Sequence, residues 1–261
     1  MRRRAVRLAL PLLLTAAANC GSTSPDPMPD RDLRILFVGN SLTYTNDLPS
    51  LVQQLGRGDP SRPVIISSVA YGNYSLEDHW NRGEALAAIQ HGPWDLVVLQ
   101  QGPSALPASR TDLIEWVTRF ATEIRRAGAR PAVYMVWPPL ARADEWDAVT
   151  ESYTAAATAA DALLFPAGEA LRSAHATDPA LALFGGDGFH PAPIGSWCAA
   201  LVIYAGAANT SPLGLTARSG GAPYPPGQIA VLEAAAADAI QRLGARSGAI
   251  LLPPKPDGGS M

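Results

Sequence analysis

The sequence predicts an α/β protein, a three-layer α/β/α sandwich in which helices cover both faces of a five-stranded parallel sheet. Short runs rich in branched apolar side chains alternate along the chain with stretches whose apolar residues recur at helical spacing. Strands in such an alternation pair in parallel and are joined by right-handed crossovers. The run at 96–99 consists of Leu and Val alone, as expected of a strand buried on both faces.

The expected elements follow one another from residue 33 to residue 243. The first run is interrupted only by Arg34 and ends in a Gly-Asn-Ser turn before an amphipathic stretch. Ser109 and Asp112 have capping-box spacing ahead of one apolar helical face, and Gly128 ends that helix. The expected strands are 33–39, 64–70, 95–100, 132–137 and 162–166. The expected helices are 47–55, 85–90, 109–128, 144–160, 169–176, 195–207 and 228–243.

Length and charge indicate one large acidic domain. The chain has 261 residues, of which 48% are apolar and 16% charged, which suffices for a core of its own. We expect the domain at 31–246, between a tether rich in Pro, Ser and Asp at 20–30 and a tail at 247–261. The net charge of −3 includes a cluster of arginines within the first seven residues, and Lys255 is the only lysine. Because the rest of the chain is acidic, nucleic acid is not an expected partner.

Residues 1–19 have the layout of a secretory signal peptide, with a basic start, an apolar run at 8–14 and small residues at 15–18. The apolar run is too short to span a bilayer. Cys20 follows directly, and this end resembles a bacterial lipoprotein signal, apart from Asn19, where such signals have Gly, Ala or Ser.

Two interpretations of this N-terminus remain. Cleavage before Cys20 with lipid attached to its thiol would anchor the protein at a bacterial membrane, in the periplasm or at the cell surface. Cleavage near Ala18 would release a secreted protein without lipid. We favour the first, because a lone cysteine at this position has little other purpose.

Cys198 is the only other cysteine, so no disulfide within the chain is expected if Cys20 carries a lipid. It lies in an apolar run. A small buried residue on a helix is therefore a better interpretation than a nucleophile.

Polar and aromatic residues collect where the expected strands end. In parallel sheets, ligands bind beyond the carboxyl ends of the strands, so we expect the functional site there. These ends carry Gly39-Asn40-Ser41, Tyr71-Gly72-Asn73, Gln100-Gln101-Gly102 and Trp137-Pro138, and a late loop carries Asp187-Gly188-Phe189-His190-Pro191.

Ser41, Asp187 and His190 are the candidate catalytic residues. A serine hydroxyl needs a base within hydrogen-bond reach and a third group that orients this base. On a tight turn, residues three apart face the same side, so Asp187 can hold the Nδ1–H group of His190 and direct Nε2 at Ser41. Thr43 breaks the Gly-x-Ser-x-Gly pattern, which disfavours an ordinary α/β-hydrolase elbow.

These residues have second interpretations. Ser41 could instead cap the following helix, and Asp187 with His190 could bind a metal, although no third ligand lies nearby in the sequence. Asn40 can hold Ser41 in place by hydrogen bonds within the turn. His79 is the main competitor as base, but a position at the surface or the rim of a pocket is the better interpretation. The same surface interpretation applies to His91 and His175.

Two blocks of sequence carry a family resemblance. Phe37-Val-Gly-Asn-Ser41-Leu-Thr resembles the first block of the SGNH, or GDSL-type, hydrolases, with Asn40 in place of the usual Asp. Asp187-Gly-Phe-His190-Pro resembles their final block. The resemblance covers 33–215 and implies the flavodoxin-like SGNH fold.

The resemblance also implies an oxyanion hole. Gly72 falls where the family places a glycine whose N–H group binds the oxyanion, together with the N–H group of Ser41. The third block departs from the family pattern, because Ser104 stands where the family has Asn. Some bacterial branches have Gln at this strand end, which assigns the amide donor to Gln100, with Gln101 as second choice.

The implied activity is that of an exported serine esterase, which hydrolyses short-chain, above all acetyl, esters through an acyl-enzyme and needs no cofactor or metal. Carbohydrate esters are one expected substrate, and a membrane is expected only through the lipid anchor. The alternatives are a lipid esterase or lysophospholipase, and a surface lipoprotein that binds glycans without turnover. The sequence does not fix an oligomeric state. The aromatic residues expected to stack on sugars are Tyr71, Trp80, Trp137 and Phe189.

Overall fold

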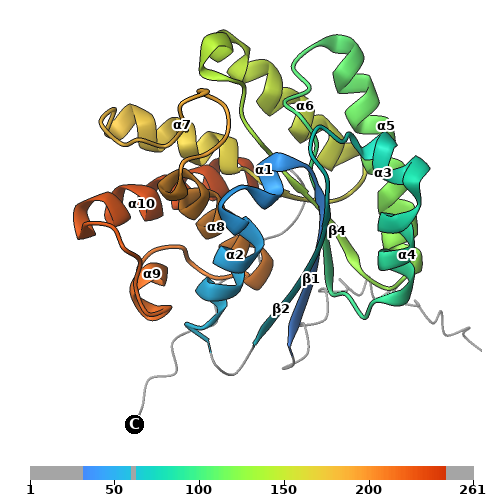
Figure 1. The fold of residues 1–261 in the computed structure, drawn as a ribbon, viewed down its shortest axis with the longest axis horizontal. Coiled ribbons are helices and arrows are strands. Elements are labelled where there is room, and N and C mark those ends of the chain that lie inside the picture. The colour runs from blue at the N-terminus through green and yellow to red at the C-terminus, as the bar shows by residue number, and fades with distance from the viewer. Residues whose placement is uncertain (1–31, 60–62, 245–261) are drawn as a thin grey trace, which may run out of the picture. The chain divides into compact units, whose positions relative to one another are not determined.

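The computed structural model describes residues 32–59 and 63–244. Its sheet confirms the predicted architecture: five parallel strands in the order β2-β1-β3-β4-β5, with helices on both faces (Figure 1). The strands are β1 (Leu33–Gly39), β2 (Val64–Ala70), β3 (Leu96–Leu99), β4 (Arg130–Tyr134) and β5 (Leu163–Phe165). The predicted signal peptide, Cys20 and the C-terminal tail lie outside the described residues.

The centre of the sheet forms the core because its strands are apolar on both faces. In β1, Phe37 lies opposite Ser68 of β2 and Val98 of β3, and both Phe37 and Val98 are fully buried. β2 is an edge strand and exposes Ser67 and Ser68. Since β1 is paired on both sides, its carboxyl end lies between those of β2 and β3.

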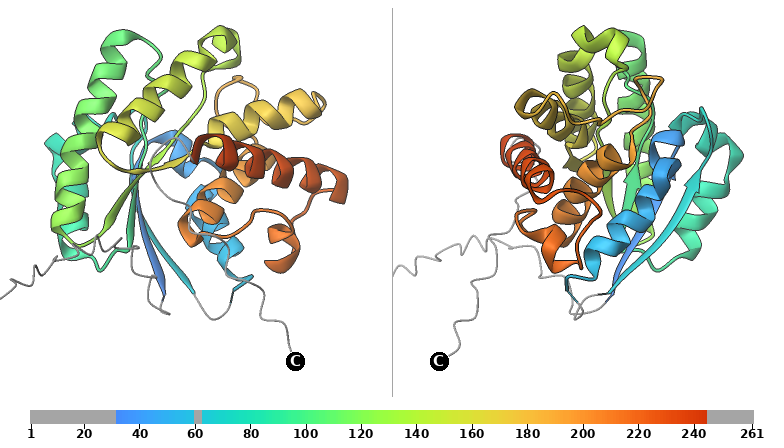
Figure 2. Two further views of the ribbon diagram at one scale, coloured as in Figure 1. Left: turned by 180° about the vertical axis from the view of Figure 1, so that it is seen from behind. Right: turned by 60° about the vertical axis from the view of Figure 1, so that its left-hand side comes forward.

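Two layers of helices cover the sheet (Figure 2). Helices α3 to α6 pack on one face, and α2, α7, α8 and α10 on the other. The described helices are α1 (Ser41–Tyr44), α2 (Leu48–Gly56), α3 (Leu76–Arg82), α4 (Glu84–His91), α5 (Pro107–Arg126), α6 (Trp146–Ala159), α7 (Ala167–Thr177), α8 (Pro193–Ala208), α9 (Leu215–Arg218) and α10 (Pro226–Gly244). Two 3₁₀ turns, η1 (Thr45–Asp47) and η2 (Leu140–Glu145), precede α2 and α6.

The predicted start of α5 is wrong. The helix begins at Pro107, which suits a first turn because its missing N–H group would have no intrahelical partner. The Ser109 hydroxyl therefore lies inside the helix and accepts the Leu106 N–H group at 3.2 Å. Asp112 is not part of a cap but accepts the indole N–H group of Trp116 at 3.0 Å.

Helix α8 is buried almost all round, because it packs against α2, α7, α10 and β5. This explains its continuous apolar sequence, which lacks the polar stripe of a surface helix. Cys198 is fully buried in it, as predicted, and burial raises the pKa of its thiol to about 12. Among the described residues, no helix combines the length and the apolar character needed to cross a bilayer.

Candidate active site

Asn40 shapes the turn that carries Ser41. Its side-chain oxygen accepts the Leu42 N–H group at 3.1 Å and so caps α1, while its Nδ2 donates to the Tyr74 carbonyl at 3.0 Å. The predicted structural role of Asn40 is therefore confirmed. Since Asn40 is the cap, Ser41 is the first residue of α1 and its hydroxyl is free for another partner.

Gln100 holds the same turn from the neighbouring strand. Its Oε1 accepts the Asn40 N–H group at 2.9 Å and the Thr43 hydroxyl at 2.8 Å. Its Nε2 donates to Asn40 Oδ1 at 2.9 Å and to the Gln101 carbonyl at 2.6 Å. Gly39 is required beside this amide, because a Cβ atom there would lie 2.5 Å from Gln100 Oε1.

The assignment of Gln100 to the oxyanion hole is wrong in this structure. The side chain is 1% exposed, both amide hydrogens are engaged, and Gln100 does not line the pocket beside Ser41. Gln101, the second choice, does line this pocket, but its Nε2 points at Ser104 Oγ (3.2 Å) and Asp112 Oδ2 (3.4 Å). Both glutamines position neighbouring segments.

The loop at 185–190 orients the imidazole of His190. Asp187 Oδ1 accepts the N–H groups of Phe189 and His190, each at 3.0 Å, and Oδ2 lies 2.5 Å from His190 Nδ1. Gly188 has φ 66°, a left-handed conformation that glycine adopts without strain. The hydrogen bonds from His190 and Phe189 lower the pKa of Asp187 to about 2, so its carboxylate stays charged at neutral pH.

The structure brings Ser41, His190 and Asp187 together. His190 Nε2 lies 2.8 Å from Ser41 Oγ, although 149 residues separate the two. The His190 and Asp187 side chains are 38% and 51% exposed, so the imidazole is accessible from solvent. A base within reach of a serine hydroxyl, and a carboxylate on its other nitrogen, is an arrangement suited to nucleophilic catalysis.

Asn46 ties the segments that carry Ser41 and His190 to each other. Its Nδ2 donates to the Pro191 carbonyl at 2.8 Å and to Ser196 Oγ at 2.9 Å. Asn46 has φ 55°, which Asn tolerates better than most residues. Its side chain thus links the segment after Ser41 to the segment after His190.

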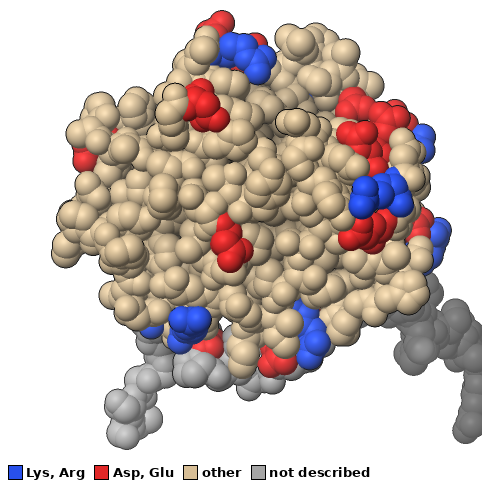
Figure 3. Space-filling view, viewed as in Figure 1, with Lys and Arg blue, Asp and Glu red and all other residues tan. Residues whose placement is uncertain are grey.

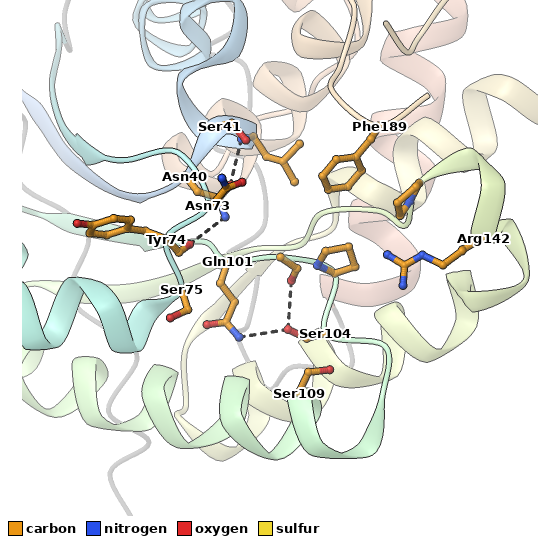
Figure 4. Close-up of a pocket in the computed structure, with 14 residues that line it drawn as sticks. Asn40, Ser41, Asn73, Tyr74, Ser75, Gln101, Ser104, Ser109, Arg142 and Phe189 are labelled. Carbon is orange, nitrogen blue, oxygen red and sulfur yellow. Dashed lines mark hydrogen bonds between the residues drawn. The ribbon is translucent and has the colours of Figure 1, made fainter. Parts of the chain in front are cut away.

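The turn after β2 presents donors beside Ser41. The Tyr74 N–H group donates to the Tyr71 carbonyl at 3.2 Å, and this closes a turn in which Asn73 has φ 63°. Within the described part of the chain, neither the Gly72 N–H group nor the Asn73 carboxamide has a hydrogen-bond partner. Asn73 lines the pocket with Asn40 and Ser41 (Figure 4).

The pocket has a volume of about 410 Å³ and is lined by both polar and apolar groups. Ser75, Ser104 and Ser109 line it, as do Phe189 and Arg142 (Figure 4). Sequence reasoning missed Asn73 and Arg142. Asn73 had a signal, since it follows Gly72 at a strand end, whereas nothing in the sequence around Arg142 indicates its position.

Of the four aromatic residues expected to bind sugar, only Phe189 lines the pocket. Trp137 is fully buried and donates its indole N–H group to the Phe189 carbonyl at 2.9 Å, so it supports the His190 loop. Trp80 packs against Trp116 and Phe120, with ring centroids 5.9 and 5.3 Å apart. Tyr71 lies outside the pocket lining; its hydroxyl contacts Glu84 Oε2 at 2.6 Å.

The expectation that His79 lies at the surface or pocket rim is wrong. The side chain is fully buried, and its Nε2 lies 2.7 Å from the Gly39 carbonyl. Burial lowers the pKa of His79, which favours the neutral ring, so Nε2–H donates to this carbonyl. His79 therefore fixes the end of β1. His91 and His175 are exposed, as predicted. Within 32–59 and 63–244, His, Cys, Asp and Glu side chains do not gather in threes as metal ligands would.

Comparison with solved structures finds clear relatives of this fold. A protein from Slackia heliotrinireducens, assigned as an SGNH hydrolase, is 31% identical over 66% of this chain and 97% of its own, with a TM-score of 0.57. A DUF4886 family protein from Bacteroides uniformis is 18% identical over 80% of this chain and 95% of its own, with a TM-score of 0.63. TesA is 18% identical over 66% of this chain and 97% of its own, with a TM-score of 0.54.

The last two similarities inform on the fold alone. No protein-family model matches the sequence, and no curated protein matches it.

Proposed function

The chain belongs to the SGNH family of serine ester hydrolases, and on that premise we propose that it removes short acyl groups, above all acetyl, from hydroxyl groups of polar molecules such as carbohydrates. The observation that carries the proposal is the series of contacts from Ser41 Oγ to His190 Nε2 (2.8 Å) and from His190 Nδ1 to Asp187 (2.5 Å). Such a series activates a serine for attack on an ester carbonyl.

In the first half of the reaction, Ser41 Oγ attacks the carbonyl carbon while His190 Nε2 takes the hydroxyl proton. Asp187 stabilises the resulting imidazolium through Nδ1–H. The alcohol leaves with the proton from Nε2, and the acyl group stays on Ser41 as an ester. In the second half, His190 takes a proton from water, the hydroxide attacks the acyl carbon, and the acid leaves as Ser41 regains its proton.

The tetrahedral intermediate carries an oxyanion that needs donors held in place before the reaction. We assign this role to the N–H groups of Ser41 and Gly72 and to Nδ2 of Asn73, in place of Gln100. The Asn73 carboxamide makes no hydrogen bond within the described residues, and it lines the pocket beside Ser41. It is tied to the Ser41 turn through the hydrogen bond from Asn40 Nδ2 to the Tyr74 carbonyl (3.0 Å).

The pocket supports a short acyl group on a polar alcohol. Its volume of about 410 Å³ lies near the lower end of small-ligand sites. Hydroxyl and amide groups line it, and Leu42 and Phe189 are its larger apolar side chains. A lysophospholipid would need a longer apolar surface for its chain. A glycan-binding protein without turnover would not need a histidine within 2.8 Å of a serine hydroxyl.

We also propose export and lipid attachment at Cys20, from the sequence of residues 1–20 alone. These residues lie outside the described part of the chain. The mass of the mature N-terminal peptide tests this part of the proposal independently of activity.

Labelling with a fluorophosphonate tests the function. We expect the folded protein to be labelled at Ser41, Ser41→Ala to remain unlabelled, and Ser173→Ala, a change in α7 outside the pocket, to label normally. Among p-nitrophenyl esters, acetate is expected to turn over faster than octanoate. A folded protein that is not labelled and binds glycans would support the non-catalytic alternative, and faster turnover of long chains would support a lipid esterase.

A further inference from the structure

The pocket beside Ser41 contains one charged side chain. Of the described residues that line it, only Arg142 is charged, and no carboxylate is among them. Most arginines of the described part pair with acids at the surface, whereas Arg142 also lines a pocket. On the face drawn in Figure 3, the basic side chains lie next to acidic ones and form no broad patch.

Arg142 is held with its charged end toward the pocket. It lies in η2, where its φ of −129° and ψ of 40° depart from the helical region. Nη1 pairs with Glu145 in the same turn, at 3.3 Å from Oε1 and 3.1 Å from Oε2. Figure 4 shows the guanidinium group pointing into the pocket, with Asn40, Asn73 and Tyr74 on the far side.

The remaining donors of Arg142 are available to a ligand. Within the described residues, Nε and Nη2 make no hydrogen bond, and the side chain is 51% exposed. A guanidinium group presents such donors in a planar fork that matches two oxygens of a carboxylate or a phosphate. Glu145 occupies only the Nη1 side and fixes the orientation of the fork.

The rest of the pocket fits a hydroxylated molecule. Ser75, Ser104 and Ser109 line it, and their hydroxyl groups already bond to the protein, to Asp78, Gly102 and Leu106. A hydroxyl oxygen has two lone pairs, so each can still accept a hydrogen bond from a sugar hydroxyl. An uncharged substrate would leave the guanidinium group without a ligand in this pocket. An anionic group on the substrate would supply one.

We propose that Arg142 forms an anion subsite, so that the substrate is an ester of a hydroxylated molecule that also carries a carboxylate or phosphate on its alcohol part. The inference rests on the proposed esterase function and names its substrate class. Ser41 attacks the acyl group at one end of the pocket while Arg142 binds the anionic group of the same molecule.

A structural role for the Arg142–Glu145 pair is the competing explanation. Exposed pairs three residues apart contribute little to stability. Arg126 and Glu123 form a comparable exposed pair at the end of α5, at 2.7 Å and outside the pocket. Arg126→Gln is therefore a matched control for Arg142→Gln.

The test compares three O-acetylated substrates: a neutral hexose, a hexuronic acid and a hexose phosphate. We expect the wild type to prefer at least one anionic substrate, and Arg142→Gln to lower its kcat/KM by about tenfold or more, through KM, as for a lost charge-assisted hydrogen bond. Turnover of the neutral ester is expected to stay within about twofold, and Arg142→Lys to recover part of the loss. The two anionic arms identify whether carboxylate or phosphate is bound.

Binding without turnover provides a second measurement. The Ser41→Ala variant is titrated with unacetylated hexuronate and hexose phosphate by calorimetry, with and without Arg142→Gln. Two results would overturn the subsite while leaving the esterase intact. The first is an equal loss of kcat/KM on all three substrates in Arg142→Gln. The second is a wild type that neither prefers an anionic substrate nor binds the free anions. Anion binding that depends on Arg142, without any ester turnover by the wild type, would instead refute the proposed function.

Discussion

Replacing Gln100 with methionine separates a positioning role from a catalytic one. Methionine has nearly the same length and no strong hydrogen-bonding group. In the structure, the change removes the acceptor of the Asn40 N–H group and of the Thr43 hydroxyl, at 2.9 and 2.8 Å. The two acceptors that lose the Gln100 amide still have other donors: Asn40 Oδ1 accepts the Leu42 N–H group, and the Gln101 carbonyl accepts the Tyr153 hydroxyl at 2.6 Å.

Two buried donors are therefore left without partners. Each costs about 1–3 kcal/mol, so the expected loss in the free energy of unfolding is about 2–6 kcal/mol. This is a large share of the roughly 5–15 kcal/mol that stabilises a typical domain. For a domain of this size, the Tm is expected to fall by about 2–4 °C for each kcal/mol.

The assay is thermal and urea unfolding of purified Gln100→Met beside the wild type, with kcat measured well below the Tm. Gln53→Met is the matched control, because Gln53 is exposed and has a single hydrogen bond, to the Val64 carbonyl at 2.9 Å. A variant with unchanged Tm whose kcat falls by about 10²–10³ would refute this reasoning, because that is the signature of a lost oxyanion donor.

Two further predictions concern the site itself. Asn73→Gly keeps the backbone at φ 63° but removes the carboxamide, so kcat is expected to fall about 10²–10³-fold with little change in KM or Tm. The control is Asn209→Gly, since Asn209 has φ 52° and lies outside the pocket. An unchanged kcat in Asn73→Gly would rule out the assigned donor. The pKa of Asp187 is lowered from its ordinary value of 3.8 to about 2. The charged carboxylate therefore contributes its full share to the stability of the folded state above pH 3.8, and this contribution is lost as the pH falls toward 2. The difference in Tm between wild type and Asp187→Asn, followed from pH 6 to pH 2, is therefore expected to shrink only at the acid end; a difference that already disappears above pH 4 would contradict the lowered pKa.

The parallel sheet is predictable because its strands follow from composition that is visible in the chain, whereas the flavodoxin-like arrangement was implied by the family resemblance. Runs such as Leu33–Gly39 are apolar enough to be recognised, and alternation with helices restricts the connections. The short helices α1 and α3 were missed, because a few residues give no clear helical period. For α3 a local signal existed: Ser75 and Asp78 form a capping box, with hydrogen bonds of 3.2 and 2.8 Å.

The site was predictable only in part. A motif indicates residue types at strand ends, and so it identified Ser41 and His190 as neighbours in space. It does not indicate where a side chain points: Gln100 and Trp137 follow strands, yet both turn inward and hold neighbouring loops. Burial and free hydrogen-bonding capacity decide which groups face a ligand, and these depend on packing between segments distant in sequence.

The link from Asn46 to Pro191 and Ser196 has a consequence for how the protein is made. The hydroxyl of Ser41 and the imidazole that serves it are 149 residues apart, so every partial chain that ends before residue 190 lacks the base. Under the proposed mechanism, Ser41 is therefore made long before the base it needs. Turnover is then expected only from a chain that extends past residue 190 and in which the late loop lies against the segment held by Asn46.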